Sequence, residues 1–273
     1  MKPRDLTALV RHAEDEQTAR HLETLLQDSA NVRVHGTVLK EKTVMELHLF
    51  GYRFRLQRNC APAALDTLYD IFIGREHQLA PGFDGMDART VVDVGANEGY
   101  YVLQLKRLNP ALTIYAFEPN PRAADRLEQA VADNGVSGIH LVRSAVSDVS
   151  ADEPFELVDE ISSIGGFRIW GYRPWLDTAR IEEILVPTVT LDEALEGVGD
   201  VDLMKIDVEG AEYRVLKGAQ RTLSHTKRIV VECHGAEMRE LVERYLTERG
   251  FERIMDTCGN DECGDLYFVR TET

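Results

Sequence analysis

The chain has 273 residues, 44% of them hydrophobic, and a formal net charge of −16. That length suffices for one large domain with a smaller attachment. The acidic balance argues against a nucleic-acid partner, because phosphate contacts supply most of the affinity of nucleic-acid binders. The start lacks a signal-peptide pattern, and no apolar run approaches the roughly 20 residues of a membrane helix. We therefore expect a cytoplasmic protein without a membrane span.

The N-terminal region changes its hydrophobic period along the chain. Leucines near helical spacing predict an amphipathic helix over residues 5–28. A period of about two follows, which predicts short antiparallel strands at 32–38, 44–50 and 52–57. A second helical pattern covers residues 63–74.

A turn-rich junction, residues 77–88 around Pro81, separates this region from the rest of the chain. We place the domain boundary there. Residues 1–84 form an N-terminal extension of helix and short strands, which could cap a site or form a homodimer contact. Residues 85–273 form the main domain.

The main domain alternates strands with helices. The predicted strands are 90–94, 112–117, 139–143, 201–206, 228–232, 251–256 and 265–270. Asn120 and Pro121 begin one intervening helix as N-cap and first helical residue, and another helix is predicted across 212–223. This alternation predicts an α/β fold with a doubly wound, mostly parallel sheet, which the last two strands close as an antiparallel hairpin.

A glycine turn, DVGANEG, runs from Asp93 to Gly99 after the first strand of this domain. In open α/β sheets, ligands bind beyond the carboxyl ends of the strands, where the strand order reverses. The next strand ends at Glu118, 19 residues after Gly99, where a carboxylate can accept hydrogen bonds from both hydroxyls of a ribose. The G-x-G-x-x-G fingerprint is absent, since Ala96 and Asn97 stand where its second glycine belongs, and this disfavours a nicotinamide dinucleotide. The pattern indicates a different nucleoside-bearing ligand.

Six segments of the main domain form an ordered set of motifs. They are DVGANEGYY, AFEPNP, SAVSD, VTLDEAL, MKIDVEGAEYRVLKGA and RIVVECH. Together, over roughly residues 85–270, they resemble the FkbM family of S-adenosylmethionine-dependent methyltransferases. The resemblance implies the seven-stranded, Rossmann-like class I methyltransferase fold with S-adenosylmethionine as methyl donor. It also implies transfer, usually to a hydroxyl oxygen, on a small metabolite, sugar or lipid-like acceptor.

The resemblance and the glycine turn together define an expected cofactor site. The glycines would let the methionine part of the cofactor lie against backbone, and Asp93 would orient the turn or meet the ammonium group. Ser144 and Ala145 would meet the adenine edge. The predicted cofactor-binding residues are Asp93, Gly95, Ala96, Asn97, Gly99, Tyr100, Glu118, Pro119, Ser144, Ala145 and Asp207.

A hydroxyl acceptor must lose its proton during methyl transfer, and polar residues after the later strands offer candidate groups. Asp207, Glu209 and His234 are the predicted catalytic residues, with Asp207 or His234 as the general base. Alternatively, Asp207, Glu209 and Glu232 hold a divalent cation such as Mg²⁺, which lowers the pKa of the acceptor. In a third interpretation the acids only complement a helix N-terminus, and we favour this for Glu212.

Two features leave alternatives open. Cys258 and Cys263 form half of a zinc site that Cys233 and His234 complete, or they simply face each other across a hairpin turn. The aromatic segment 166–175 is either a lid or interaction surface, or a loop that buries its own tryptophans.

These patterns predict an S-adenosylmethionine-dependent enzyme that methylates a hydroxyl of a small-molecule acceptor. N-methylation of an amine or amide is an alternative within the same fold. A nicotinamide-dependent oxidoreductase and a non-catalytic nucleoside-binding protein are alternatives of other classes.

Overall fold

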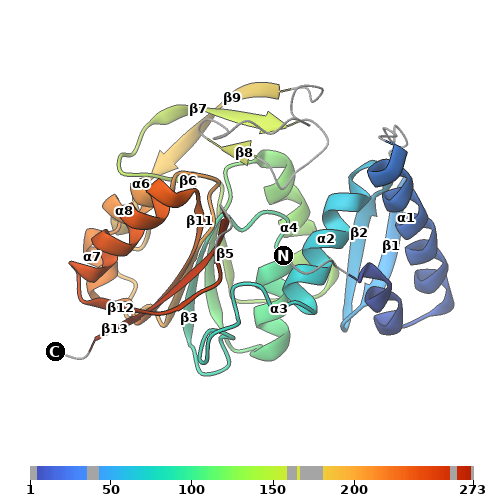
Figure 1. Ribbon diagram of the computed structural model, residues 1–273, viewed down its shortest axis with the longest axis horizontal. Coiled ribbons are helices and arrows are strands. Elements are labelled where there is room, and N and C mark those ends of the chain that lie inside the picture. Colours follow the sequence, from blue (N-terminus) through green and yellow to red (C-terminus); the bar gives the residue numbers. More distant parts are fainter. Residues whose placement is uncertain (1–4, 36–42, 159–164, 167–180, 259–262, 272–273) are drawn as a thin grey trace.

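The computed structural model describes residues 5–35, 43–158, 165–166, 181–258 and 263–271. At its centre lies a seven-stranded sheet with the strand order β12-β13-β11-β10-β3-β4-β5 (Figure 1). Its strands are β3 (Thr90–Val94), β4 (Thr113–Phe117), β5 (Ile139–Val142), β10 (Leu203–Ile206), β11 (Arg228–His234), β12 (Phe251–Asp256) and β13 (Cys263–Arg270).

The strand directions confirm the predicted doubly wound sheet and its closing hairpin. Strands β5, β4, β3, β10 and β11 run parallel, whereas β13 is antiparallel to both β11 and β12. The chain moves from β3 outward to β4 and β5, and then returns to β10 on the other side of β3. Strand order therefore reverses between β3 and β10, and a ligand crevice is expected beyond their carboxyl ends.

Helices bury both faces of this sheet, because neighbouring strand residues point to opposite sides. Val91 shares a core cluster with α3 (Tyr100–Leu108) and α4 (Pro121–Asp133). Its neighbour Val92 belongs to a second cluster on the other face. The helices that contribute to the second cluster are α5 (Leu191–Ala194), α6 (Glu212–Lys217), α7 (Gln220–Ser224) and α8 (Ala236–Thr247).

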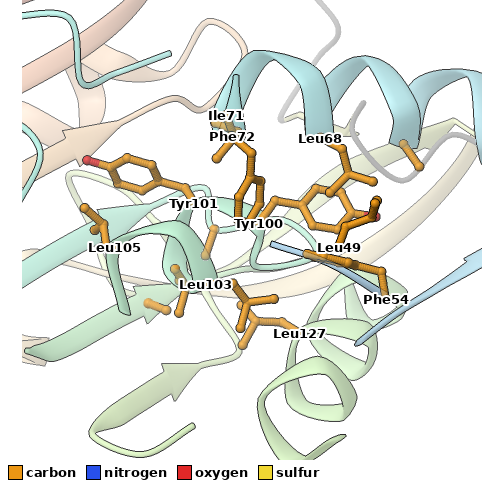
Figure 2. Packing of buried hydrophobic residues seen from close by; sticks show 14 of the residues in the cluster. Leu49, Phe54, Leu68, Ile71, Phe72, Tyr100, Tyr101, Leu103, Leu105 and Leu127 are labelled. Atoms are coloured by element: carbon orange, nitrogen blue, oxygen red, sulfur yellow. The ribbon is translucent and has the colours of Figure 1, made fainter. Parts of the chain in front are cut away.

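The N-terminal part packs against α3 and α4. Its elements are a 3₁₀ helix (Leu6–His12), α1 (Glu16–His35), the antiparallel pair β1 (Val44–Leu49) and β2 (Tyr52–Gln57), a 3₁₀ turn (Arg58–Cys60) and α2 (Ala61–Phe72). Figure 2 shows the shared core, in which side chains of β1, β2 and α2 meet Tyr100 and Leu103 of α3 and Leu127 of α4. The ring centroid of Phe54 lies 5.8 Å from that of Tyr100 and 5.7 Å from that of Phe72.

Three predicted elements are wrong. The single helix predicted over residues 5–28 is instead a 3₁₀ helix, Leu6–His12, followed by α1, Glu16–His35. A new helix begins there because Oδ1 of Asp15 accepts a hydrogen bond from the backbone N–H of Thr18 at 2.6 Å. Residues 32–35, predicted to begin a strand, continue helix α1, and the rest of that segment lies outside the described residues. Extending an existing helix needs no new nucleus, so a short β-like period does not stop it. The helix predicted over 212–223 is divided at Gly218, where an added Cβ would lie 2.0 Å from the carbonyl oxygen of Ser147.

A second sheet was not predicted from the sequence. Its strands, in the order β6-β9-β7-β8, are β6 (Ala145–Val146), β9 (Ile181–Val189), β7 (Asp152–Val158) and β8 (Gly165–Gly166). In Figure 1, β7 and β9 lie across the top of the molecule. Pro154 and Pro187 fall inside β7 and β9, and proline within an apolar run argues against a strand. Of the segment 166–175, only Gly166 lies within the described residues.

None of the helices in the described ranges has the length and apolar character needed to cross a bilayer. The domain boundary at residue 84 stays a prediction. The apolar residues before it and those of α3 belong to one continuous core cluster.

Candidate cofactor and acceptor site

A pocket opens where the strand order reverses, beyond the carboxyl ends of β3, β4 and β10. It encloses about 600 Å³ of space, part of it open to solvent. Its walls come from the turns after β3 and β10, the end of β4, the β5–β6 segment and strand β7. The lining residues are Val94, Gly95, Asn97, Phe117, Glu118, Pro119, Asn120, Ser144, Ala145, Val146, Phe155, Asp207, Val208 and Glu209.

The two glycines of the first turn make room for the protein's own atoms. An added Cβ at Gly95 would lie 1.8 Å from the carbonyl oxygen of Asp207, and one at Gly99 would lie 2.8 Å from Cγ of Leu127. Both glycines also have positive φ values, 83° and 84°, which residues with a side chain rarely adopt. This corrects the expectation that a cofactor is what excludes side chains there. Instead, the backbone after β10 approaches Gly95 and the side chain of Leu127 in α4 approaches Gly99.

A buried lysine holds this turn in place. Lys205, 3% exposed, donates a hydrogen bond from Nζ to the carbonyl oxygen of Gly95 at 2.7 Å. Its ammonium also lies 3.2 Å from Oδ1 of Asp93 and 3.5 Å from Oδ2 of Asp207. Burial acts to lower the pKa of Lys205, but the two carboxylates outweigh burial and raise the pKa, so the lysine stays charged. Asp93 therefore lies within ion-pair distance of the ammonium group that holds the turn.

Glu118 presents a buried carboxylate to the pocket. The residue is 6% exposed, and Oε2 and Oε1 accept hydrogen bonds from the backbone N–H groups of Asn97 and Asn120, each at 2.8 Å. Burial raises the pKa of Glu118 to about 7, although the two hydrogen bonds act in the opposite direction. Each carboxylate oxygen retains a further acceptor position. The geometry is therefore compatible with the ribose-binding role predicted for Glu118.

The predicted cofactor-binding residues fall into two groups. One group lines the pocket and comprises Gly95, Asn97, Glu118, Pro119, Ser144, Ala145 and Asp207. The other group lies behind that lining and comprises Asp93, Ala96, Gly99 and Tyr100. Tyr100 faces the N-terminal part, where its hydroxyl donates to Oε2 of Glu98 at 2.9 Å and its ring packs against Phe54.

Part of the pocket wall was missed in the sequence. The additional lining residues are Val94, Phe117, Asn120, Val146, Phe155 and Val208. The positions of Val94 and Phe117 were predictable, because they end the two strands that carry the glycine turn and Glu118. Phe155 had no such signal, because it reaches the pocket only through β7 of the unpredicted second sheet.

A polar cluster continues from the pocket toward β11 and β13. Nε2 of His77 lies 4.0 Å from Oδ2 of Asp207, and ligand atoms of His77, Asp207 and Glu232 all lie within 4.8 Å of one another. Burial acts to raise the pKa of Asp207, but Lys205 and His77 outweigh it and hold the pKa below its usual range. Burial, with Asp207 nearby, raises the pKa of Glu232 to about 8. The side of the pocket next to Asp207 therefore adjoins a cluster of ionisable side chains.

His77 comes from the segment before β3, which the sequence marked only as a junction. Its side chain is 3% exposed, and Nδ1 lies 2.8 Å from Oδ1 of Asp265. Oδ2 of Asp265 accepts hydrogen bonds from the backbone N–H of His77 at 3.0 Å and from the hydroxyl of Tyr267 at 2.7 Å. Burial acts to lower the pKa of His77, but Asp265 raises it to about 10. No local pattern in the sequence identifies this residue as part of a site.

The geometry of His234 disagrees with a general-base role. Its Nδ1 lies 2.8 Å from Oε1 of Glu212, and its Nε2 lies 3.3 Å from Oε2 of Glu209. Burial acts to lower the pKa of His234, but Cys263 and the two carboxylates raise it to about 12. A ring that is already protonated near neutral pH does not accept a proton. Glu212, expected only to complement a helix, is fully buried and holds this ring.

The predicted cation ligands are divided between two clusters. Glu209 pairs with His234 and Asp207 meets His77, whereas Glu232 lies within ligand distance of both histidines. Asp207 and Glu232 therefore lie near His77, a histidine from the segment that precedes β3 in the chain.

The cysteines do not assemble as the zinc hypothesis required. All four are free thiols, and the group that lies within ligand distance around His234 contains Cys263 and Glu232. Cys263 donates a hydrogen bond from Sγ to Oε1 of Glu232 at 2.9 Å. Within the described residues, Cys258 and Cys233 are buried thiols outside that group.

Comparison with known proteins matches the Methyltransferase FkbM domain to residues 93–253. Methyltransferase sdnD of Sordaria araneosa is 28% identical over 61% of this chain and 74% of its own length. Hexuronic acid methyltransferase AglP of Haloferax volcanii is 28% identical over 62% of this chain and 66% of its own length. The 31-O-demethyl-FK506 methyltransferase FkbM of Streptomyces tacrolimicus is 29% identical over 62% of this chain and 74% of its own length.

The sheet order, the pocket at its reversal point and these matches define a class I, Rossmann-like methyltransferase that depends on S-adenosylmethionine. More specifically, the chain belongs to the FkbM methyltransferase domain family, whose domain covers more than half of it. The family resemblance of the six sequence motifs is confirmed.

Proposed function

We propose that this enzyme transfers the methyl group of S-adenosylmethionine to a hydroxyl oxygen of a small-molecule acceptor. The observation that carries the proposal is the pocket with Glu118 at one side and Asp207 at the other. One carboxylate faces the part expected to hold the nucleoside, and the other faces the polar acceptor side. The relative named 31-O-demethyl-FK506 methyltransferase supports an oxygen as the acceptor atom.

The pocket residues divide the binding of the cofactor among them. Glu118 would accept hydrogen bonds from the two ribose hydroxyls, and Ser144 and Ala145 would meet the adenine edge. The backbone around Gly95 would receive the methionine part, and Phe155 lines the pocket from β7. The cofactor supplies a methyl group bound to positively charged sulfur, and an acidic pocket favours such a cation.

Asp207 is the group that accepts the proton of the acceptor hydroxyl. Methyl transfer is an in-line displacement: the acceptor oxygen bonds to the methyl carbon, the carbon–sulfur bond breaks, and sulfur leaves as a neutral thioether. Holding the two reactants in line supplies much of the rate gain. The hydroxyl proton becomes strongly acidic as the oxygen is methylated, so a weak base suffices. Asp207, kept ionised by Lys205 and His77, accepts that proton.

The alternatives receive less support. Membership of a methyltransferase family leaves an oxidoreductase or a non-catalytic regulator unsupported, and the relatives favour oxygen over nitrogen as acceptor atom. The net charge of −16 favours a small molecule over a nucleic acid. A divalent cation such as Mg²⁺, a homodimer and a cytoplasmic location stay predictions.

Calorimetric titration with S-adenosylhomocysteine tests the cofactor site. Ribose hydroxyls donate to the ionised form of Glu118, so bound ligand lowers the pKa from its raised value of about 7. Affinity should therefore rise as pH increases from 6 to 8, by up to about tenfold, and level off above that. Glu118→Gln should weaken binding about tenfold or more and abolish the pH dependence.

Glu128→Gln is the matched control, because Glu128 lies on α4 with a side chain that is 62% exposed. It should bind like the unmodified enzyme at both pH values. Unchanged affinity in Glu118→Gln, or binding of NAD but not of S-adenosylhomocysteine, would contradict the proposal.

A further inference from the structure

The polar cluster beside the pocket has the composition of a metal site. A ring nitrogen of His77 and one carboxylate oxygen each of Asp207 and Glu232 lie within 4.8 Å of one another. Nε2 of His77 is 4.0 Å from Oδ2 of Asp207. They come from three separate parts of the chain, namely the segment before β3, the end of β10 and strand β11. Ligands at about 2.1 Å from one ion lie about 3 Å apart when adjacent and about 4.2 Å apart when opposite. Small side-chain shifts would therefore place all three on one ion.

The surroundings of His77 add an independent argument. Within the described residues, its buried ring makes one hydrogen bond, from Nδ1 to Asp265, and Nε2 makes none. Asp265 is itself 4% exposed and is held by the hydroxyl of Tyr267. Nε2 is thus directed at Asp207, with a carboxylate fixed behind the ring. This arrangement typically orients a histidine that binds a metal.

We propose that His77, Asp207 and Glu232 bind one divalent cation of the kind that accepts mixed oxygen and nitrogen ligands, such as Mn²⁺. Compared with the ligands expected from the sequence, His77 takes the place of Glu209. Three protein ligands leave coordination positions for water and for an oxygen of the acceptor. The use of the ion to hold the acceptor hydroxyl beside the pocket rests on the proposed function. The binding of the cation does not. Asp207 would bind the ion through one carboxylate oxygen, as each residue of the group offers one ligand atom, and would accept the hydroxyl proton on the other.

Manganese uptake by the full chain tests the site directly. Protein freed of metal with a chelator is titrated with Mn²⁺ at pH 8, without cofactor or acceptor, and free Mn²⁺ is followed by its electron paramagnetic resonance signal. The expected result is one Mn²⁺ bound per chain. His77→Gln and Glu232→Gln should each weaken binding at least tenfold, whereas His140→Gln should not. His140 is an exposed histidine that stacks on Tyr115 in the neighbouring strand.

Circular dichroism shows whether each variant is folded. If His77→Gln is unfolded, the Mn²⁺ affinity of Glu232→Gln alone tests the proposed site. No stoichiometric uptake by the unmodified enzyme would overturn the proposal. Retention of tight uptake in a folded variant of either ligand would overturn it as well. The Mn²⁺ titration contains no cofactor, so a negative result says nothing about binding of S-adenosylhomocysteine. The cation site and the proposed methyltransferase function can therefore be contradicted independently of each other.

Discussion

Lys205 and Gly95 tie the first turn to the end of β10, and each acts through its own chemistry. Lys205 donates from a buried ammonium to the carbonyl oxygen of Gly95. Gly95, having no side chain, lets the carbonyl oxygen of Asp207 approach its Cα. The pocket floor is therefore a direct contact between two backbone segments. Its position depends on these two residues before any cofactor binds.

Gly95→Ala should destabilise the fold by about 3 kcal/mol or more. A left-handed backbone costs a residue with Cβ about 1–2 kcal/mol, and the contact with Asp207 adds an overpacking cost. Gly51→Ala is the control, because Gly51 has the same φ of 83° but nothing within 4 Å of an added Cβ. It should cost about 1 kcal/mol. Urea denaturation measures both, and equal losses would show that the contact with Asp207 is unimportant.

A cluster of charged side chains connects the second sheet to helix α6. Arg214 donates to both carboxylate oxygens of Glu153 at 2.9 and 2.6 Å, and to Oδ1 of Asp148 at 3.0 Å. Lys217 also donates to Asp148. Glu153 lies in β7, the strand that brings Phe155 to the pocket. The cluster therefore connects one wall of the pocket to the helix layer of the main sheet.

Asp148→Asn should destabilise the enzyme by about 1 kcal/mol at pH 7. Burial acts to raise the pKa of Asp148, but Lys217 and Arg214 outweigh it and hold the pKa well below its usual range. The stabilisation is complete above the ordinary carboxyl pKa and is lost as pH falls through the lowered value. Urea denaturation at pH 7 and pH 3 should therefore show a smaller difference between the variant and the unmodified enzyme at pH 3.

The control for this comparison is Asp125→Asn. The side chain of Asp125 is 71% exposed where it pairs with Arg143. Asp125→Asn should therefore leave the free energy of unfolding nearly unchanged at both pH values. A difference for Asp148→Asn that does not depend on pH would mean that its charge is not what stabilises the second sheet.

The N-terminal part of the whole molecule shares an apolar core with the central sheet. Phe54 of β2 packs on Tyr100 of α3 (Figure 2). Both belong to one cluster that reaches the central sheet at Val91 and Ile114. Separate units would each need a core of their own. The shared cluster indicates one cooperative unit.

Calorimetry should accordingly show a single unfolding transition. Phe54→Ala should lower the free energy of unfolding by about 3–4 kcal/mol and move the whole transition to lower temperature. Val44→Ala, at a 56% exposed position of β1, should leave it nearly in place. Two transitions, of which Phe54→Ala moves only one, would show that the N-terminal part is a separate domain.

The strands of the main sheet were predictable because their residues are apolar in continuous runs and are separated by clear turn and capping signals. Asn120 caps α4 as expected, since its side chain accepts a hydrogen bond from the backbone N–H of Arg122 at 3.0 Å. The second sheet was not predictable. Its strands carry internal prolines and acidic residues, and their pairing joins segments that are about 30 residues apart.

The alternation of strands and helices, the glycine turn and the position of Glu118 were all predictable from the sequence. These features depend on local hydrophobic period and on where each strand ends. By contrast, the fold brings His77 to Asp265, 188 residues away, and to a position facing Asp207. The fold also places Phe155 in the pocket wall. Such contacts follow from the order of strands in the sheet, which no short stretch of sequence encodes, because each residue's own neighbourhood is compatible with many strand orders.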